Sequence, residues 1–254
     1  MCGIAGAITR KEISINKIQK CLSSLNHRGP DHFGFKKIKI SNDWHSLQIH
    51  TRLSIIDLNE RSNQPMQIGD NFLTFNGEIY NYLELRRKYS DHNIYQTASD
   101  TEVLGKLLSI LKMESLKELE GMWAFSWLDT NKKSLNLCRD KFGKKPLFYH
   151  LLSDGGIIYG STPQAIFDLL GYKLSINFKH IQRYIVNGYK SLFKSEDSFF
   201  NGIKQIPSGN FLVWDPTSSI KINRDSTGIA HGIINSIPIA FVNNFEKFSI
   251  FDKS

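Results

Sequence analysis

The sequence predicts an α+β fold in which antiparallel sheets are covered by helices. Three features of the chain lead to this prediction. A run of small apolar residues at 3–8 is typical of a buried strand and starts almost at the first residue. Two hairpin patterns follow much later, over 122–138 and 147–159. Other segments have apolar residues that repeat every three or four positions, as in helices.

The first helix is expected over 14–25, with Ser14 as its N-cap. The apolar residues that share one face of this helix are Ile15, Ile18, Leu22 and Leu25. The Gly and Pro within 27–31 end the helix. The apolar segment 72–75 is then expected to be a strand that ends at Asn76-Gly77.

A second strong helical pattern begins at Ser99 or Asp100, either of which is suited to cap it. The other expected helices are 81–89, 163–170 and 178–186, and the other expected strands are 122–128, 134–138, 147–152, 157–159 and 211–214. After Trp214 the pattern weakens, so the segment 215–254 is left unassigned.

The charge of the chain does not indicate a nucleic-acid partner. The formal net charge of +8 has the sign that such binding requires. However, the basic residues are scattered, and the longest basic runs are pairs such as Lys36-Lys37 and Lys144-Lys145. Because a binding surface needs clustered charge, no nucleic acid is expected to bind.

Cysteine content and the N-terminus favour the cytoplasm. Three cysteines, Cys2, Cys21 and Cys138, argue against a disulfide framework, and no secretory signal is apparent. The segment 226–245 contains no Asp, Glu, Lys or Arg and approaches the length of a membrane span. It contains Pro238 and is only about half apolar, so no transmembrane helix is expected there.

The N-terminus carries the strongest chemical signal. Cys2 follows the initiator Met, and a small second residue permits removal of Met1, which leaves Cys2 with a free α-amine. An α-amine has an unperturbed pKa of roughly 7.7–8.0 and a thiol one of roughly 8.5, so one residue would hold both a nucleophile and a base. The alternative is that a cysteine at this position has no function. Gly3 and the strand that begins there favour the catalytic interpretation, since they would fix the thiol on a rigid element.

Further motifs follow in order along the chain. They are Cys2-Gly3-Ile4-Ala5-Gly6, His27-Arg28-Gly29-Pro30-Asp31, the run Arg52 to Leu58, the run Asn76 to Tyr82, Ser99-Asp100-Thr101-Glu102 and the run Arg139 to Leu147. Together they resemble the class II glutamine amidotransferases, which are N-terminal-nucleophile hydrolases, and most closely the glutaminase half of glutamine-hydrolysing asparagine synthetase. The resemblance covers 2–214 and implies a four-layer αββα sandwich of antiparallel sheets.

The resemblance implies hydrolysis of L-glutamine to L-glutamate and ammonia through a thioester on Cys2. Asn76, through its side-chain amide, and Gly77, through its backbone N–H, would form the oxyanion hole. The alternative is that Asn-Gly is only a hairpin turn, of which it is the commonest sequence.

The residues that the resemblance assigns to substrate binding are Arg52, Leu53, Ser54, Ile55, Ile56, Glu78 and Asp100. Arg52 would hold the α-carboxylate of glutamine by two parallel hydrogen bonds, unless it forms a surface ion pair instead. Leu53 to Ile56 would form the pocket wall through their backbone. Asp100 and Glu78 would receive the α-ammonium, although Asp100 could also be a helix N-cap.

Other conspicuous residues are expected to be structural. The segment 28–31 would shape a loop near the site, and Arg139 and Asp140 could equally form a structural salt bridge. Cys21 and Cys138 are expected to be inert thiols. No histidine spacing indicates a metal site, and the glutaminase reaction needs no cofactor.

The resemblance also has a gap. Asparagine synthetases bind ATP through an S-G-G-x-D-S loop, which the chain lacks. ATP and Mg²⁺ would therefore belong to a synthetase half absent here, and the ammonia would serve a separate synthetase chain. A homodimer is compatible with the resemblance. The alternative hypothesis is an inactive remnant or interaction module.

Overall fold

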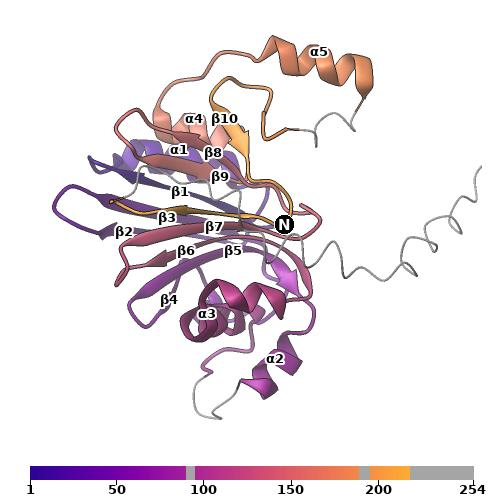
Figure 1. Cartoon of the computed structure of the whole chain (residues 1–254). Coiled ribbons are helices and arrows are strands. Elements are labelled where there is room, and N and C mark those ends of the chain that lie inside the picture. The colour runs from indigo at the N-terminus through magenta and orange to yellow at the C-terminus, as the bar shows by residue number, and fades with distance from the viewer. Residues whose placement is uncertain (90–94, 189–194, 218–254) are drawn as a thin grey trace, which may run out of the picture.

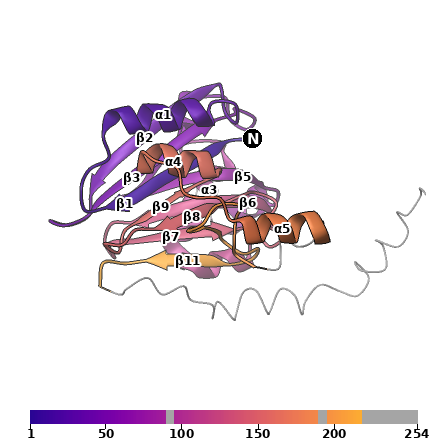
Figure 2. The same ribbon diagram turned by 90° about the horizontal axis from the view of Figure 1, so that it is seen from above.

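Two antiparallel sheets stack face to face, and helices cover both outer faces, giving the four layers seen in Figures 1 and 2. The structure is a computed structural model that describes residues 1–89, 95–188 and 195–217. The predicted fold class is therefore confirmed, including the αββα layering.

The first sheet has six strands in the order β10-β8-β9-β1-β3-β2. Their bounds are β1 Gly3–Thr9, β2 His32–Lys39, β3 His45–Arg52, β8 Phe148–Leu151, β9 Ile157–Gly160 and β10 Ile203–Gln205. The second sheet has five strands in the order β11-β7-β6-β5-β4. Their bounds are β4 Met66–Ile68, β5 Asn71–Ile79, β6 Gly121–Asp129, β7 Ser134–Arg139 and β11 Phe211–Trp214.

Three apolar cores hold the layers together. The helices are α1 Ile15–Leu25, α2 Tyr82–Lys88, α3 Asp100–Leu111, α4 Pro163–Leu170 and α5 Phe178–Asn187, with 3₁₀ turns at Glu60–Ser62 and Lys112–Lys117. Helices α1 and α4 pack on the six-stranded sheet through residues such as Ile18 and Ile166. Helix α3 packs on the five-stranded sheet through residues such as Leu104. Between the sheets lies a third core that includes Ile4 and Trp214.

Most elements agree with the sequence prediction, with differences at the first helix. Ile15, Ile18, Leu22 and Leu25 were predicted to share one face of helix α1, and of these Ile18, Leu22 and Leu25 are buried whereas Ile15 is 47% exposed. Ile15 lies in the first turn, and the buried face is completed instead by Cys21. Ser14 is the N-cap residue by its extended backbone, yet its side chain makes no capping hydrogen bond.

Strand β5 does not end at Asn76-Gly77. It continues to Ile79, and Asn76 and Gly77 pair with Ala124 and Trp123 of β6. The predicted end of the strand and the hairpin-turn alternative were therefore both wrong. Pairing with β6 overrides the turn preference of Asn-Gly.

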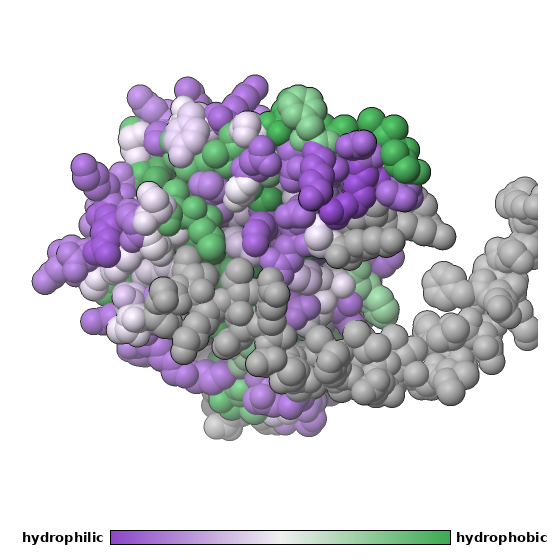
Figure 3. All heavy atoms as spheres, turned by 45° about the horizontal axis from the view of Figure 1, so that its top comes forward, coloured by the Kyte–Doolittle hydropathy of each residue, from purple (hydrophilic) through white to green (hydrophobic). Residues whose placement is uncertain are grey.

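Helix α5 stands apart from the sheets, and most of it is exposed. Phe178 is 74% exposed, Ile185 74% and Val186 73%, while His180 is the buried residue of the helix. Apolar side chains gather over α5 at the upper right of Figure 3.

No helix among the described residues is both long and apolar enough to cross a membrane. The segment 226–245, which the sequence analysis considered as a membrane span and rejected, lies outside the described residues.

Candidate functional site

The pairing of β1 with β3 brings the N-terminus to the first group of predicted site residues. Gly3 pairs with Thr51, so Cys2 lies beside Arg52 and Leu53 at the end of the six-stranded sheet. The backbone N–H of Leu53 donates to the Cys2 Sγ at 3.4 Å, and the thiol faces the Leu53 carbonyl oxygen at 3.7 Å. The predicted nucleophile is thus fixed by the first residue of the predicted pocket wall.

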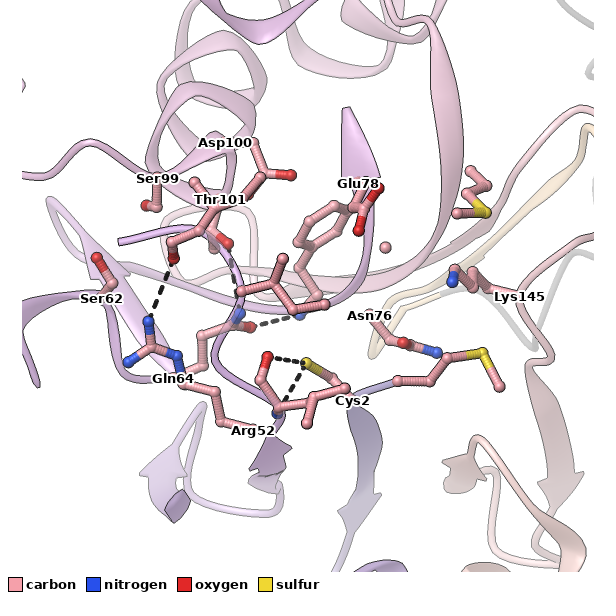
Figure 4. A pocket seen from close by; sticks show the side chains of 17 residues that line it. Cys2, Arg52, Ser62, Gln64, Asn76, Glu78, Ser99, Asp100, Thr101 and Lys145 are labelled. Atoms are coloured by element: carbon pink, nitrogen blue, oxygen red, sulfur yellow. Dashed lines mark hydrogen bonds between the residues drawn. The ribbon is translucent and has the colours of Figure 1, made fainter. Parts of the chain in front are cut away.

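A cavity of about 270 Å³ separates Cys2 from strand β5 of the second sheet. Its lining residues are Met1, Cys2, Arg52, Leu53, Ile55, Ile56, Ser62, Gln64, Phe75, Asn76, Gly77, Glu78, Ser99, Asp100, Thr101, Met122 and Lys145. This volume suits a ligand of amino-acid size, since pockets that bind larger, drug-sized ligands have volumes of roughly 300–1,000 Å³. Figure 4 shows the side chains of Cys2, Arg52, Asn76, Glu78 and Asp100 around it.

One edge of β5 presents backbone N–H groups to this cavity. Trp123 exchanges hydrogen bonds with Asp140, so its N–H and carbonyl point away from β5. Gly77, its partner in the pairing, is therefore in a non-hydrogen-bonded pair, and the Gly77 N–H points away from β6. Two flanking N–H groups lie on the same edge of β5. The Phe75 N–H donates to the Gln64 Oε1 at 2.6 Å, and the Ile79 N–H donates to the Asp100 Oδ2 at 3.0 Å. The Gly77 N–H lies between them and faces the cavity.

The Asn76 side chain supplies a second donor. Asn76 is 1% exposed, and its Nδ2 has no hydrogen-bond partner among the described residues. A buried amide N–H without an acceptor costs about 1–3 kcal/mol, so a carbonyl or oxyanion in the cavity would be stabilised there.

Two carboxyl groups face the opposite part of the cavity. Ser99 caps α3 by accepting from the Glu102 N–H at 3.2 Å, so Asp100 is not the N-cap. Asp100 instead accepts the Ile79 N–H and lies near Glu78. Burial, with a smaller contribution from the negative charge of Glu78, raises the pKa of Asp100 to about 6. A cationic group bound between the two carboxylates would relieve both effects.

The Cys2 thiol is not activated by its surroundings alone. Burial raises its pKa, while the Leu53 N–H, the nearby amino terminus and the positive charge of Arg52 act in the opposite direction. The thiol therefore stays protonated at neutral pH and needs a base to become a nucleophile. Cys21 and Cys138 are buried, and burial raises the pKa of both thiols, that of Cys138 to about 12, as expected of inert cysteines.

Arg52 is buried and makes no ion pair within the described part of the chain, which argues against the surface-ion-pair alternative. Its terminal nitrogens donate to the Asn63 Oδ1 at 2.7 Å and to the carbonyls of Asn59, Ile56 and Asp57. The guanidinium thus shapes the loop 53–63 around the cavity. A carboxylate bound to it by two bonds would have to replace some of these acceptors.

Two polar residues to which the sequence analysis gave no role connect the segments around the cavity by hydrogen bonds. Asp57 accepts the Ala98 N–H at 2.8 Å and so joins the loop after β3 to the loop before α3. Gln64 accepts the Phe75 N–H and donates to the Thr101 Oγ1 at 3.4 Å, joining β5 to α3. Their signal in the sequence was weak, because both roles depend on contacts between distant segments.

The segment 28–31, which was predicted to shape a loop near the site, contacts both Cys2 and the loop after β3. The Arg28 Nε donates to the Cys2 carbonyl at 3.1 Å, and the Asp31 Oδ2 accepts the Ser54 N–H at 2.7 Å. Ser54 itself does not line the cavity, unlike its neighbours Leu53 and Ile55.

Arg139 and Asp140 bond mainly to backbone groups and not to each other, and Arg139 also donates to the Gln205 Oε1. Arg139 donates to carbonyls that include those of Lys145 and Ile206. Asp140 is fully buried and accepts N–H groups that include those of Phe142 and Lys145. Together they fix the loop after β7.

Comparison with known proteins agrees with this geometry. Residues 1–224 match the family model described as a glutamine amidotransferase domain. Asparagine synthetase [glutamine-hydrolyzing] 2 of Oryza sativa is 31% identical over 93% of this chain, and asparagine synthetase [glutamine-hydrolyzing] 1 of Bacillus subtilis is 33% identical over 73% of it. Among solved structures, the glutamine phosphoribosylpyrophosphate amidotransferase of B. subtilis superposes on 87% of the chain with a TM-score of 0.60 at 20% identity, covering 48% of that protein.

The chain spans only part of these relatives. It corresponds to 39% of the rice protein and 29% of the B. subtilis synthetase.

Proposed function

The chain belongs to the glutamine amidotransferase domain family, and we propose that it hydrolyses L-glutamine to L-glutamate and ammonia. The observation that carries this proposal is one cavity lined by a thiol, by the hydrogen-bond donors of Asn76 and Gly77, by two carboxyl groups and by an arginine. That pattern matches the side-chain amide and the charged α-groups of a free amino acid.

In the proposed reaction, Met1 has been removed and the α-amine of Cys2 takes the thiol proton. The sulfur bonds to the amide carbon of glutamine, and the C=O electron pair moves to the oxygen beside Asn76 and Gly77. The amine returns the proton to the amide nitrogen, which leaves as ammonia when the C–N bond breaks. Water then adds to the thioester carbon while the amine takes one of its protons. The S–C bond breaks as that proton passes to sulfur, which restores the thiol and releases glutamate.

Substrate binding follows from the charges. Asp100 and Glu78 would hold the α-ammonium, and the buried Arg52 would attract the α-carboxylate, displacing loop carbonyls that it now contacts. Leu53, Ile55 and Ile56, which line the cavity, would enclose the aliphatic part of the substrate.

Glutamate release by the purified chain tests this function directly. Intact mass must first show that Met1 is absent, since the base depends on its removal. We expect glutamate and ammonia in equal amounts when glutamine is added. A processed, folded chain that releases neither would exclude the glutaminase and favour a non-catalytic interaction module.

Replacing Asn76 with alanine should lower kcat while leaving KM nearly unchanged. The side-chain amide would be lost as an oxyanion donor, and loss of one such donor costs about 10²–10³ in rate. Asn71→Ala is a matched control, because Asn71 lies on the same strand but accepts the Thr130 N–H at 3.0 Å, away from the cavity. Equal kcat for Asn76→Ala and wild type would refute the oxyanion hole.

Glutamine affinity should fall below about pH 6. The pKa of Asp100 is raised to about 6, so this carboxyl gains a proton below that pH and no longer attracts an ammonium group. Calorimetric titration of the inactive Cys2→Ala variant should show a Kd that is constant at neutral pH and rises about tenfold per unit once Asp100 is protonated. A Kd that does not change with acidification would argue against Asp100 as the ammonium site.

We further propose that the ammonia serves a synthetase half like the one that the relatives' names indicate. Identity to asparagine synthetases over most of this chain supports this assignment. ATP and Mg²⁺ would act in that half only. A domain boundary at 214, a cytoplasmic location and a homodimer stay predictions.

A further inference from the structure

A buried lysine lines the cavity and has no role in the reaction as described. Lys145 is 7% exposed and borders the same cavity as Cys2 and Asn76. In Figure 4 its amine points toward the cavity, and Cys2 and Asn76 lie between it and Arg52. Among the described residues, no carboxylate lies within 4.0 Å of this amine. A buried cation without an anion beside it is unfavourable, so negative charge that forms in the cavity would be stabilised by it.

The backbone of Lys145 is held rigidly in place. Its N–H donates to the Asp140 Oδ2 at 2.9 Å, and its carbonyl accepts from the Arg139 Nε at 2.8 Å. The same Asp140 oxygen accepts the Trp123 N–H at 3.3 Å, which ties this loop to β6 and therefore to the partner of Gly77. The run Arg139 to Leu147, to which the sequence analysis gave no chemical role, thus places a cationic residue on the same cavity as Asn76 and Gly77.

We propose that Lys145 is an electrostatic residue of the glutaminase site, whose ammonium stabilises the negative charge on the amide oxygen during attack by Cys2. The inference rests on the proposed function. Asn76 and Gly77 would donate hydrogen bonds to that oxygen, and Lys145 would act on it through its positive charge from the Asn76 side. Because the charge exists only in the transition state and the tetrahedral intermediate, the effect belongs to kcat.

Steady-state glutamine hydrolysis by four proteins tests this role. They are wild type, Lys145→Met, Lys145→Arg and Lys144→Met, the last a control that removes the same charge from the exposed neighbouring residue. We expect Lys145→Met to lower kcat by roughly tenfold to a hundredfold, less than the loss of a direct donor, with KM unchanged. Lys145→Arg should recover much of kcat, and Lys144→Met should match wild type. Melting temperature and glutamate affinity of each variant show whether the fold and pocket are intact.

The outcomes separate this inference from the proposed function. A wild type that does not release glutamate refutes the glutaminase and this inference with it. An active wild type with unchanged kcat in Lys145→Met refutes only the role of Lys145. A rise in KM at constant kcat also overturns it, because Lys145 would then bind the substrate carboxylate. Equal losses in Lys145→Met and Lys145→Arg, with lower melting temperatures, would show a purely structural role.

Discussion

Glutamate release is expected to fall by roughly 10⁴-fold or more when Cys2 is replaced with alanine, because no other group in the cavity can form the thioester. Cys2 Sγ is held by the Leu53 N–H at 3.4 Å and faces Asn76 and Gly77 across the cavity. The assay is glutamate formation from glutamine at saturating substrate. Cys21→Ala serves as the control, because Cys21 lies on the buried face of α1 and does not line the cavity.

The same mechanism predicts that retention of Met1 inactivates the enzyme with the thiol still present. Burial keeps the Cys2 thiol protonated at neutral pH, so the reaction depends on a base. With Met1 in place, the nitrogen of Cys2 is an amide that cannot accept a proton. Glutaminase activity at the wild-type rate in a preparation whose mass shows Met1 intact would contradict the proposed base.

Asp100→Asn is expected to weaken glutamine binding about a hundredfold and to stabilise the folded protein at neutral pH. The loss of affinity follows from the lost attraction to the α-ammonium. The gain in stability follows from the pKa of Asp100, which is about 6 when folded, above its ordinary value near 3.8. A raised carboxyl pKa means that ionisation opposes folding, so the penalty is absent below about pH 4 and complete above the folded pKa. Removing it should add about 1–3 kcal/mol to the free energy of unfolding at neutral pH.

Chemical denaturation at neutral and at acidic pH tests the second half of this prediction. The stability difference between Asp100→Asn and wild type should disappear once the wild-type carboxyl is protonated in both states. Asp129→Asn is a suitable comparison, because Asp129 is also buried but lies at the far end of β6 from the cavity, where it accepts the Lys132 N–H. If Asp100→Asn lost stability at neutral pH, its carboxylate would have a structural role that outweighs its burial.

The sequence predicted the elements whose apolar residues follow a clear period, and it missed those whose buried residues are polar. Strand β3 is almost entirely buried, yet it carries Gln48 and His50. Ser126 of β6 donates to the Gln48 Oε1 at 2.5 Å, and the His50 Nε2 lies 3.1 Å from the carbonyl of Phe75 in β5. These hydrogen bonds cross between the sheets, so no hydrophobic pattern marks the strand. Strand β2 was missed for the opposite reason, since this edge strand is largely exposed and rich in lysine.

The candidate site shows the same division. Residues within short motifs, such as Cys2, Arg52 and Asn76, could be chosen from the sequence and do surround one cavity. Gln64 lies in none of these motifs, and Lys145 lies in one, the run Arg139 to Leu147, but was given no role. Each reaches the cavity from a segment whose position depends on packing between distant parts of the chain. The turn preference of Asn76-Gly77 also led to a wrong prediction of where β5 ends, because pairing with β6 overrides that preference.

Strand β5 is continuous along the wall of the cavity, and this has an evolutionary consequence. The N–H of Phe75 donates to Gln64, that of Gly77 faces the cavity, and that of Ile79 donates to Asp100. Each of these alternate positions therefore has a different neighbour. Loss or gain of one residue in the strand would turn the Asn76 amide to the opposite face and exchange these contacts in a single step. Descendants of this chain can therefore vary the lengths of surface connections, whereas insertions and deletions between Asn71 and Ile79 should be purged.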